Sequence, residues 1–118
     1  MNIIIIGRGN VATNLDYAFR KQGVACQMVS SREGLDQLPP ANVYIYAVKD
    51  EVLADVVALV KGKERALHLH TSGTMPITAF GEDKPHVGIF YPFQTFSKER
   101  VIEDFSAIPV FFEARGID

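Results

Sequence analysis

A run of four isoleucines, Ile3 to Ile6, leads directly into the sequence Gly7-Arg8-Gly9-Asn10-Val11-Ala12. An unbroken β-branched run is typical of a central strand that is covered on both faces, so residues 2–6 are predicted to form one. Residues 10–22 predict a helix, with Asn10 as its cap. The apolar positions of this helix recur at helical spacing: Val11, Ala12, Leu15, Ala18 and Phe19. A strand, a glycine turn and a helix in this order predict a phosphate-binding turn.

Each position of this GxGxxA pattern has its own expected role. Gly7 permits a tight turn out of the strand, Gly9 lets the backbone approach a pyrophosphate, and Ala12 lets the helix pack closely on the strand. The phosphates would lie on free N–H groups at the positive end of the helix. We therefore predict that all six residues bind a dinucleotide: Gly7, Arg8, Gly9, Asn10, Val11 and Ala12. A tight turn that binds nothing is the alternative.

The end of the second predicted strand, residues 25–30, indicates which dinucleotide is bound. NAD sites usually carry Asp or Glu there, whereas this chain has Ser30-Ser31-Arg32 and no carboxylate before Glu33. A carboxylate would repel the 2′-phosphate of NADP, while Ser and Arg side chains can bind it. The sequence therefore predicts NADP, with Ser31 and Arg32 as its ligands. A solvated Arg32 is the alternative.

The remaining apolar runs alternate with helical patterns, which predicts an α/β fold with a mostly parallel sheet. Further strands are expected at 42–48, 66–70, 87–93 and 109–112, and a loop at 94–108. A helix is expected at 50–62, and shorter helical turns at 35–38 and 75–80. The 50–62 helix should turn five apolar residues inward: Val52, Leu53, Val56, Val57 and Val60. No linker is visible, so residues 1–118 are predicted to be one domain.

Composition excludes several classes of partner. A net charge of −2 offers no electrostatic basis for binding nucleic acid or an anionic membrane. The isoleucine run is too short to cross a membrane and lacks the flanks of a signal peptide. The single cysteine, Cys26, excludes an internal disulfide and fits a reducing compartment. We therefore expect a cytoplasmic protein.

Polar residues follow the middle strands. Lys49 either approaches the cofactor or is solvated, and Asp50 is expected to cap the next helix. His68 and His70 alternate with leucines, so both rings point to one face of their strand. With no third ligand evident, no metal site is predicted. His70 lies nearer the carboxyl end of the strand, where ligands bind in open α/β sheets, and is the candidate for a site role.

Two hydroxyl groups are candidates for the substrate side. Ser72 is expected to hydrogen-bond a substrate or the nicotinamide, with a helix cap by Ser72 or Thr74 as the alternative. Tyr91 is held extended by Pro92 and either donates a proton to a reduced carbonyl or imine, or packs in the core. The predicted catalytic residues are Ser72, Tyr91 and His70.

Five segments together carry a family resemblance. They are Gly7 to Ala12, Ser30-Ser31-Arg32, Ala47-Val48-Lys49-Asp50, His70-Thr71-Ser72-Gly73 and Tyr91-Pro92-Phe93-Gln94-Thr95-Phe96-Ser97. The chain resembles the N-terminal Rossmann-like domain of a family of NADP-dependent oxidoreductases. That family is similar to pyrroline-5-carboxylate reductase, prephenate dehydrogenase and F420-dependent NADP reductase.

The resemblance implies a three-layer fold and hydride transfer between the nicotinamide and a small carbonyl, imine or hydroxy substrate. It implies that Ala47, Val48 and Lys49 run under the nicotinamide ribose. It also implies that Ser72 and Tyr91 line the substrate side, where Ser72 would also touch the cofactor.

Two departures from the family pattern shape the expected fold. Only about ten residues connect Arg32 to Asn42, too few for a helix and another strand, so the third strand is predicted to be missing. That leaves the second strand at the sheet edge and the adenine pocket thinner. The family's C-terminal helical domain, which usually forms the dimer, is expected to be absent.

A non-catalytic dinucleotide-binding or interaction module is therefore the alternative function. A cluster of phenylalanines is expected either to fill the core or to form a homodimer face: Phe90, Phe93, Phe96, Phe105, Phe111 and Phe112.

Overall fold

The computed structural model describes residues 2–72, 75–81, 84–92 and 110–115. Its centre is one six-stranded sheet in the order β2-β1-β3-β4-β5-β6. The strands are β1 (Asn2–Ile6), β2 (Ala25–Val29), β3 (Val43–Tyr46), β4 (Leu67–His70), β5 (Val87–Pro92) and β6 (Val110–Arg115). The first five run parallel, and β6 is antiparallel to β5. The expected α/β class with a mostly parallel sheet is confirmed.

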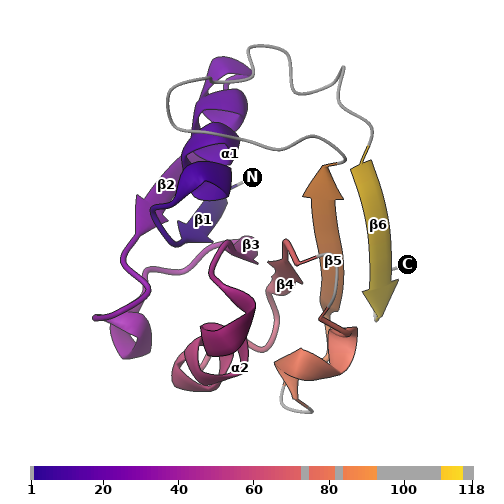
Figure 1. Ribbon diagram of the computed structural model, residues 1–118. Helices are drawn as coiled ribbons and strands as arrows, with labels where there is room; N and C mark the ends of the chain where they lie inside the picture. The colour runs from indigo at the N-terminus through magenta and orange to yellow at the C-terminus, as the bar shows by residue number, and fades with distance from the viewer. Residues whose placement is uncertain (1, 73–74, 82–83, 93–109, 116–118) are drawn as a thin grey trace.

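The sheet separates two layers of helical structure (Figure 1). Helix α1 (Asn10–Lys21) packs on one face, and helix α2 (Asp50–Leu59) packs on the other with the 3-10 turns η1 (Leu35–Gln37) and η2 (Ile77–Phe80). Strand β1 serves both faces, because Ile3 and Ile5 join the core under α1 while Ile4 and Ile6 join the core under α2. All four side chains are at most 4% exposed, as expected for a central strand. None of the described helices is long and apolar enough to cross a membrane.

The connection from β2 to β3 is as short as the sequence indicated. It contains only η1, whose Leu35 is buried together with the following Leu38 in the core on the α2 side. No strand is formed between β2 and β3, so β2 is the edge of the sheet, as predicted. In the sheet, β2 therefore lies on one side of β1, and β3 lies on the other side of β1. The carboxyl ends of β1 and β3 form the switch point at which open α/β sheets bind ligands.

Three local predictions were wrong. Val52 is 41% exposed, because the inward stripe of α2 consists of Leu53, Val56, Val57 and, just past its end, Val60, and Val52 lies beside that stripe. Asn10 and Asp50 occupy the first position of their helices, one residue after the caps Gly9 and Lys49, and no side chain caps either helix.

The loop predicted at 94–108 lies outside the described residues, as do Phe93, Phe96 and Phe105.

Buried polar rings stabilise the α2 side of the sheet. The Tyr46 hydroxyl lies 2.8 Å from His68 Nδ1, and His68 Nε2 lies 2.8 Å from the Lys63 carbonyl oxygen. Because a carbonyl only accepts, His68 Nε2 carries the hydrogen and Tyr46 donates to Nδ1. Among the described residues, no three His, Cys, Asp or Glu side chains are grouped as a metal site would require.

Replacing Tyr46 with phenylalanine should lower the free energy of unfolding by about 1–3 kcal/mol, because the His68 acceptor is fully buried and would lose its donor. Tyr44→Phe is the matched control. It removes a 2.6 Å hydrogen bond to the carbonyl of Pro39, an exposed residue where water can replace the donor, and should cost less. Urea denaturation measures both. An equal loss in the two variants would contradict this account.

Candidate functional site

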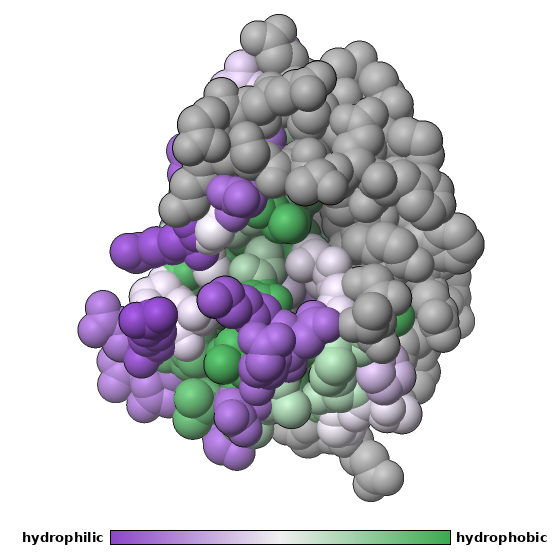
Figure 2. Space-filling view, viewed as in Figure 1, coloured by the Kyte–Doolittle hydropathy of each residue, from purple (hydrophilic) through white to green (hydrophobic). Residues whose placement is uncertain are grey.

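A cavity of about 520 Å³ opens at the carboxyl ends of β1 and β3. Its walls come from the glycine turn 7–9, the segment 30–32 after β2, and the segment 47–49 with Val52 and Val56 of α2. The surface view shows this region as a hollow with hydrophobic groups inside and hydrophilic side chains at the rim (Figure 2). Its size is within the range of small-molecule and cofactor sites.

Gly7 brings the two strand ends together. Its φ of +128° is a conformation that residues with a side chain rarely adopt, and a Cβ at this position would overlap the carbonyl oxygen of Ala47. The Gly7 N–H donates to the Val29 carbonyl and the Ala47 N–H donates to the Ile6 carbonyl, both at 2.9 Å. Glycine is therefore required at position 7 by the fold itself.

Gly9 differs from Gly7, because nothing in the described protein requires a glycine there. Its φ of −83° suits any residue, and a Cβ would meet no atom within 4 Å. It lines the cavity and precedes α1, so a side chain at this position would project into open space at the start of the helix. A ligand that approaches the backbone closely would account for the glycine.

The first turn of α1 offers uncompensated positive charge. No side chain caps the helix, and its first turn holds no acidic residue. Helix α2, in contrast, begins with Asp50 and Glu51. Since the N-terminus of a helix favours negative charge, an anion for α1 would have to come from outside the helix.

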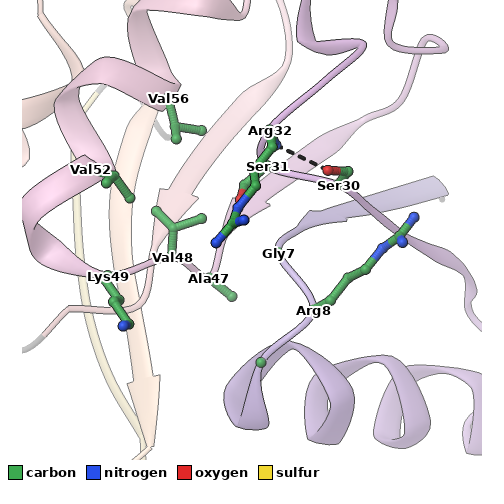
Figure 3. A pocket seen from close by; sticks show the side chains of 11 residues that line it. Gly7, Arg8, Ser30, Ser31, Arg32, Ala47, Val48, Lys49, Val52 and Val56 are labelled. Carbon is green, nitrogen blue, oxygen red and sulfur yellow. Dashed lines mark hydrogen bonds between the residues drawn. The ribbon is translucent and has the colours of Figure 1, made fainter.

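Three cations line the same cavity: Arg8, Arg32 and Lys49. None of the described lining residues is acidic. In Figure 3 the Arg32 side chain runs beside Val48 toward the gap between Gly7 and Ala47, while Arg8 extends away on the far side of the glycine turn. This concentration of positive charge in a chain of net charge −2 favours an anionic ligand.

The turn that presents Arg32 is held by Ser30. The backbone N–H of Arg32 donates to Ser30 Oγ at 3.0 Å (Figure 3), so the serine fixes the conformation of the segment after β2. Ser30 also lines the cavity but was not among the predicted ligands. A hydroxyl residue two positions before Arg32, in a turn, was the signal that could have identified it.

Eight of the twelve predicted cofactor residues line the cavity: Gly7, Arg8, Gly9, Ser31, Arg32, Ala47, Val48 and Lys49. The predicted ligands Asn10, Val11 and Ala12 do not line it. Ala12 is a fully buried residue of α1 that packs against the sheet, where its small size serves packing as expected. Ser72 does not line the cavity either. Sequence reasoning did not predict the lining role of Val52 and Val56, which it had assigned to the core.

His70 lies inside the protein. It is 0% exposed and stacks on Phe80, with 5.3 Å between the ring centroids. The Ser72 N–H donates to its Nδ1 at 3.1 Å, so its Nε2 carries the hydrogen and donates to the Pro76 carbonyl at 3.3 Å. Both ring nitrogens thus hold the turn after β4. This enclosure favours a positioning role for His70, and its predicted catalytic role stays a prediction.

Ser72 and Tyr91 both lie near the carboxyl ends of neighbouring parallel strands. Ser72 follows β4 and is half-buried, and its Oγ accepts a hydrogen bond from the Met75 N–H at 3.0 Å. This bond holds the turn before η2 but does not cap it, because η2 begins after Pro76 and has no side-chain cap. Thr74, the other capping candidate, lies outside the described residues. Tyr91 lies on β5 next to its carboxyl end. Its side chain is outside the described part of the chain, so its catalytic role stays a prediction.

Of the comparisons with known proteins, the one with solved structures found similar proteins. No protein-family model and no curated protein matches the chain. Among solved structures, the chain is similar to the putative NADP oxidoreductase BF3122 from Bacteroides fragilis, with 36% identity and a TM-score of 0.82 over 96% of this chain and 51% of that one. The expected resemblance to NADP-dependent oxidoreductases is confirmed.

Two more distant structures share the fold. A dimeric ketopantoate reductase from Staphylococcus aureus is 17% identical with a TM-score of 0.64, over 89% of this chain and 44% of that one. Protein TM1727 from Thermotoga maritima is 13% identical with a TM-score of 0.62, over 95% and 48% of the two chains. The chain thus spans about half the length of these three relatives.

Proposed function

Because the chain resembles the Rossmann-like domain of NADP-dependent oxidoreductases, we propose that the cavity binds NADP(H). The chain would be the cofactor-binding part of an enzyme that transfers hydride between the nicotinamide and a small carbonyl, imine or hydroxy substrate. One observation carries this proposal. Three cations and the uncapped start of α1 surround a single cavity that has no acidic residue among its described walls. NADP(H) combines a pyrophosphate with a 2′-phosphate, so its charge suits these walls.

The pyrophosphate is assigned to the glycine turn. The open space in front of Gly9 lets phosphate oxygens reach the backbone, and the N–H groups of the first turn of α1 point toward this end of the helix. Arg8 extends from the same turn and adds positive charge. These groups would bind NADP(H) and NAD(H) equally, because both contain the pyrophosphate.

The 2′-phosphate is assigned to the segment after β2. Arg32 supplies a guanidinium, and Ser31 adds a hydroxyl. Ser30 Oγ already accepts the Arg32 N–H, so its own hydrogen is suited to donation toward a phosphate oxygen. Hydrogen bonds between charged partners are worth about 1.5–3 kcal/mol each, enough to favour NADP over NAD.

The nicotinamide and the substrate are assigned to the carboxyl ends of β3 to β5. Ala47, Val48 and Lys49 would lie beneath the nicotinamide ribose, and the hydroxyls of Ser72 and Tyr91 would donate hydrogen bonds or a proton to the substrate. The cofactor, when bound, supplies the hydride. A homodimer and a cytoplasmic location remain part of the proposal.

Arg32→Ala should raise the Kd of NADPH by about ten- to a hundredfold and change the Kd of NADH by less than about threefold. The reason is that only NADPH carries the phosphate assigned to Arg32. Titration followed by nicotinamide fluorescence measures both constants. Arg8→Ala is the matched control, and it should weaken the two dinucleotides by the same factor. Equal losses of NADPH and NADH in Arg32→Ala would refute the 2′-phosphate role.

A turnover assay distinguishes the proposed oxidoreductase from a non-catalytic dinucleotide-binding module. Hydride transfer with NADPH across a panel of small carbonyl and imine compounds would support the oxidoreductase. Tight NADPH binding without turnover of any compound would support a non-catalytic binding module. If neither dinucleotide binds at millimolar concentration, both functions are excluded.

A further inference from the structure

Strand β2 forms one side of the sheet, so the outer N–H and C=O groups of its backbone meet no further strand in the described part of the chain (Figure 1). Its sequence, Ala-Cys-Gln-Met-Val, contains no charged residue and no proline. These are the residues with which proteins commonly prevent a sheet edge from pairing with another chain. The opposite edge, β6, does contain charges, Glu113 and Arg115. The β2 edge is therefore suited to pairing with a further strand.

A pair of opposite charges on α1 lies beside this edge. Arg20 Nε is 2.9 Å from Asp16 Oδ1, and the two side chains are 59% and 16% exposed. Asp16 also reaches β2. Burial raises the pKa of the Cys26 thiol to about 12, and the neighbouring Asp16 carboxylate, which accepts a hydrogen bond from the thiol, adds to the rise. The charge pair thus lies on the flank of α1 that faces the edge strand, next to the middle of that strand.

A two-fold axis through the middle of β2 satisfies the strand and the charges together. Antiparallel pairing of two copies around the central residue places Gln27 opposite Gln27 and Cys26 opposite Met28. The axis is then perpendicular to the sheet, so both α1 helices lie on one face and run antiparallel. Strands are about 4.8 Å apart, so helices that each pack over β1 and β2 come about 10 Å apart, the spacing of packed helices. Asp16 of each copy then faces Arg20 of the other.

We propose that two copies of this chain associate through β2, in antiparallel register centred on Gln27, with Asp16 and Arg20 of both copies in one network of four charges. The proposal rests on the homodimer of the proposed function and assigns its interface. Two six-stranded sheets become one continuous sheet. The charges beside the edge are complementary to themselves under the two-fold axis, which favours a second copy over an unrelated strand as the partner.

Cysteine cross-linking tests the register. In a Cys26→Ser background, Gln27→Cys should give a disulfide-linked dimer on oxidation, measured by non-reducing gel electrophoresis. Opposite residues of antiparallel strands have Cα atoms about 4.5–5.5 Å apart, within the reach of a disulfide. Ala25→Cys in the same background is the matched control, because Ala25 is exposed on the same face of β2 but its two copies would be about 13 Å apart. Equal cross-linking of the two variants, or none of Gln27→Cys, would overturn the proposal.

Charge reversal tests the network. Asp16→Arg and Arg20→Asp should each raise the Kd of the dimer by at least about tenfold in analytical ultracentrifugation, because like charges then face each other across the axis. Mixed in equal amounts, the two variants should associate again, since each meets the opposite charge on the other, and this recovery excludes misfolding as the cause of the loss. Lys61→Glu, an exposed charge reversal just past the end of α2, should dimerise like the wild type.

The remaining outcomes separate this interface from the function proposed above. A monomeric wild type would overturn both the interface and the homodimer. A dimer that neither charge reversal weakens would retain the homodimer but overturn its assignment to β2. A chain that cross-links at Gln27 and binds neither NADPH nor NADH would support the interface and refute cofactor binding.

Discussion

Gly9→Ala is expected to weaken NADPH binding by at least about tenfold while changing the free energy of unfolding by less than about 1 kcal/mol. The added methyl group meets no protein atom and requires no unusual backbone angle, so the fold should tolerate it. It would instead occupy the space through which a pyrophosphate approaches the N–H groups of α1. Fluorescence titration with NADPH and urea denaturation of the same preparation measure the two effects.

The dinucleotide used does not alter this expectation. NADH should lose as much affinity as NADPH in Gly9→Ala, because both carry the pyrophosphate, and this contrasts with the selective loss in Arg32→Ala. Wild-type NADPH affinity in a folded Gly9→Ala protein would mean that the glycine turn does not contact the phosphates, and the assignment of the pyrophosphate would have to be abandoned.

Gly7→Ala is expected to have the opposite pattern, with a loss of more than about 3 kcal/mol in the free energy of unfolding. Two costs combine at this position. A residue with a side chain is strained at a φ of +128°, and its Cβ would overlap the Ala47 carbonyl oxygen and push apart the ends of β1 and β3. The total free energy of unfolding of a domain is only about 5–15 kcal/mol, so the midpoint of urea unfolding should fall sharply.

Gly23→Ala separates the two costs. Gly23 also has a positive φ, +79°, but a Cβ there would meet no atom within 4 Å. It should lose only the strain contribution, about 1–2 kcal/mol. Similar losses in Gly7→Ala and Gly23→Ala would show that the close approach of Ala47 contributes nothing, contrary to the geometry of the turn.

The sequence predicted the order and type of the first strands and helices because these depend on local patterns. The isoleucine run, the helical spacing after Gly9 and the length of the connection after Arg32 each contain enough information to place β1, α1 and the edge position of β2. The predicted residues that line the cavity followed from the same patterns, since strand ends and glycine turns can be located without knowing how the elements pack.

The sequence was least informative where the packing of one element on another decides the surroundings of a residue. Helical periodicity identifies an apolar stripe but not which neighbour faces each edge of it, so Val52 was assigned to the core although it lines the cavity. The alternation around His70 places its ring on one face of the strand, but only the η2 turn and Phe80 show that this face is covered. Ser30 was named in the segment before Arg32 but not predicted as a ligand, because its hydrogen bond to the backbone of Arg32 shows only in the folded turn.

The cavity walls are also notable for where they lie along the chain. Every described wall residue falls between Gly7 and Val56, whereas the candidate substrate groups Ser72 and Tyr91 come later. Segments so close in sequence meet with little loss of loop entropy. The walls of the cavity therefore form from one continuous stretch of chain. Substitutions after Val56 can therefore alter the side chains at the carboxyl ends of β4 and β5 without changing the residues that form the cavity walls.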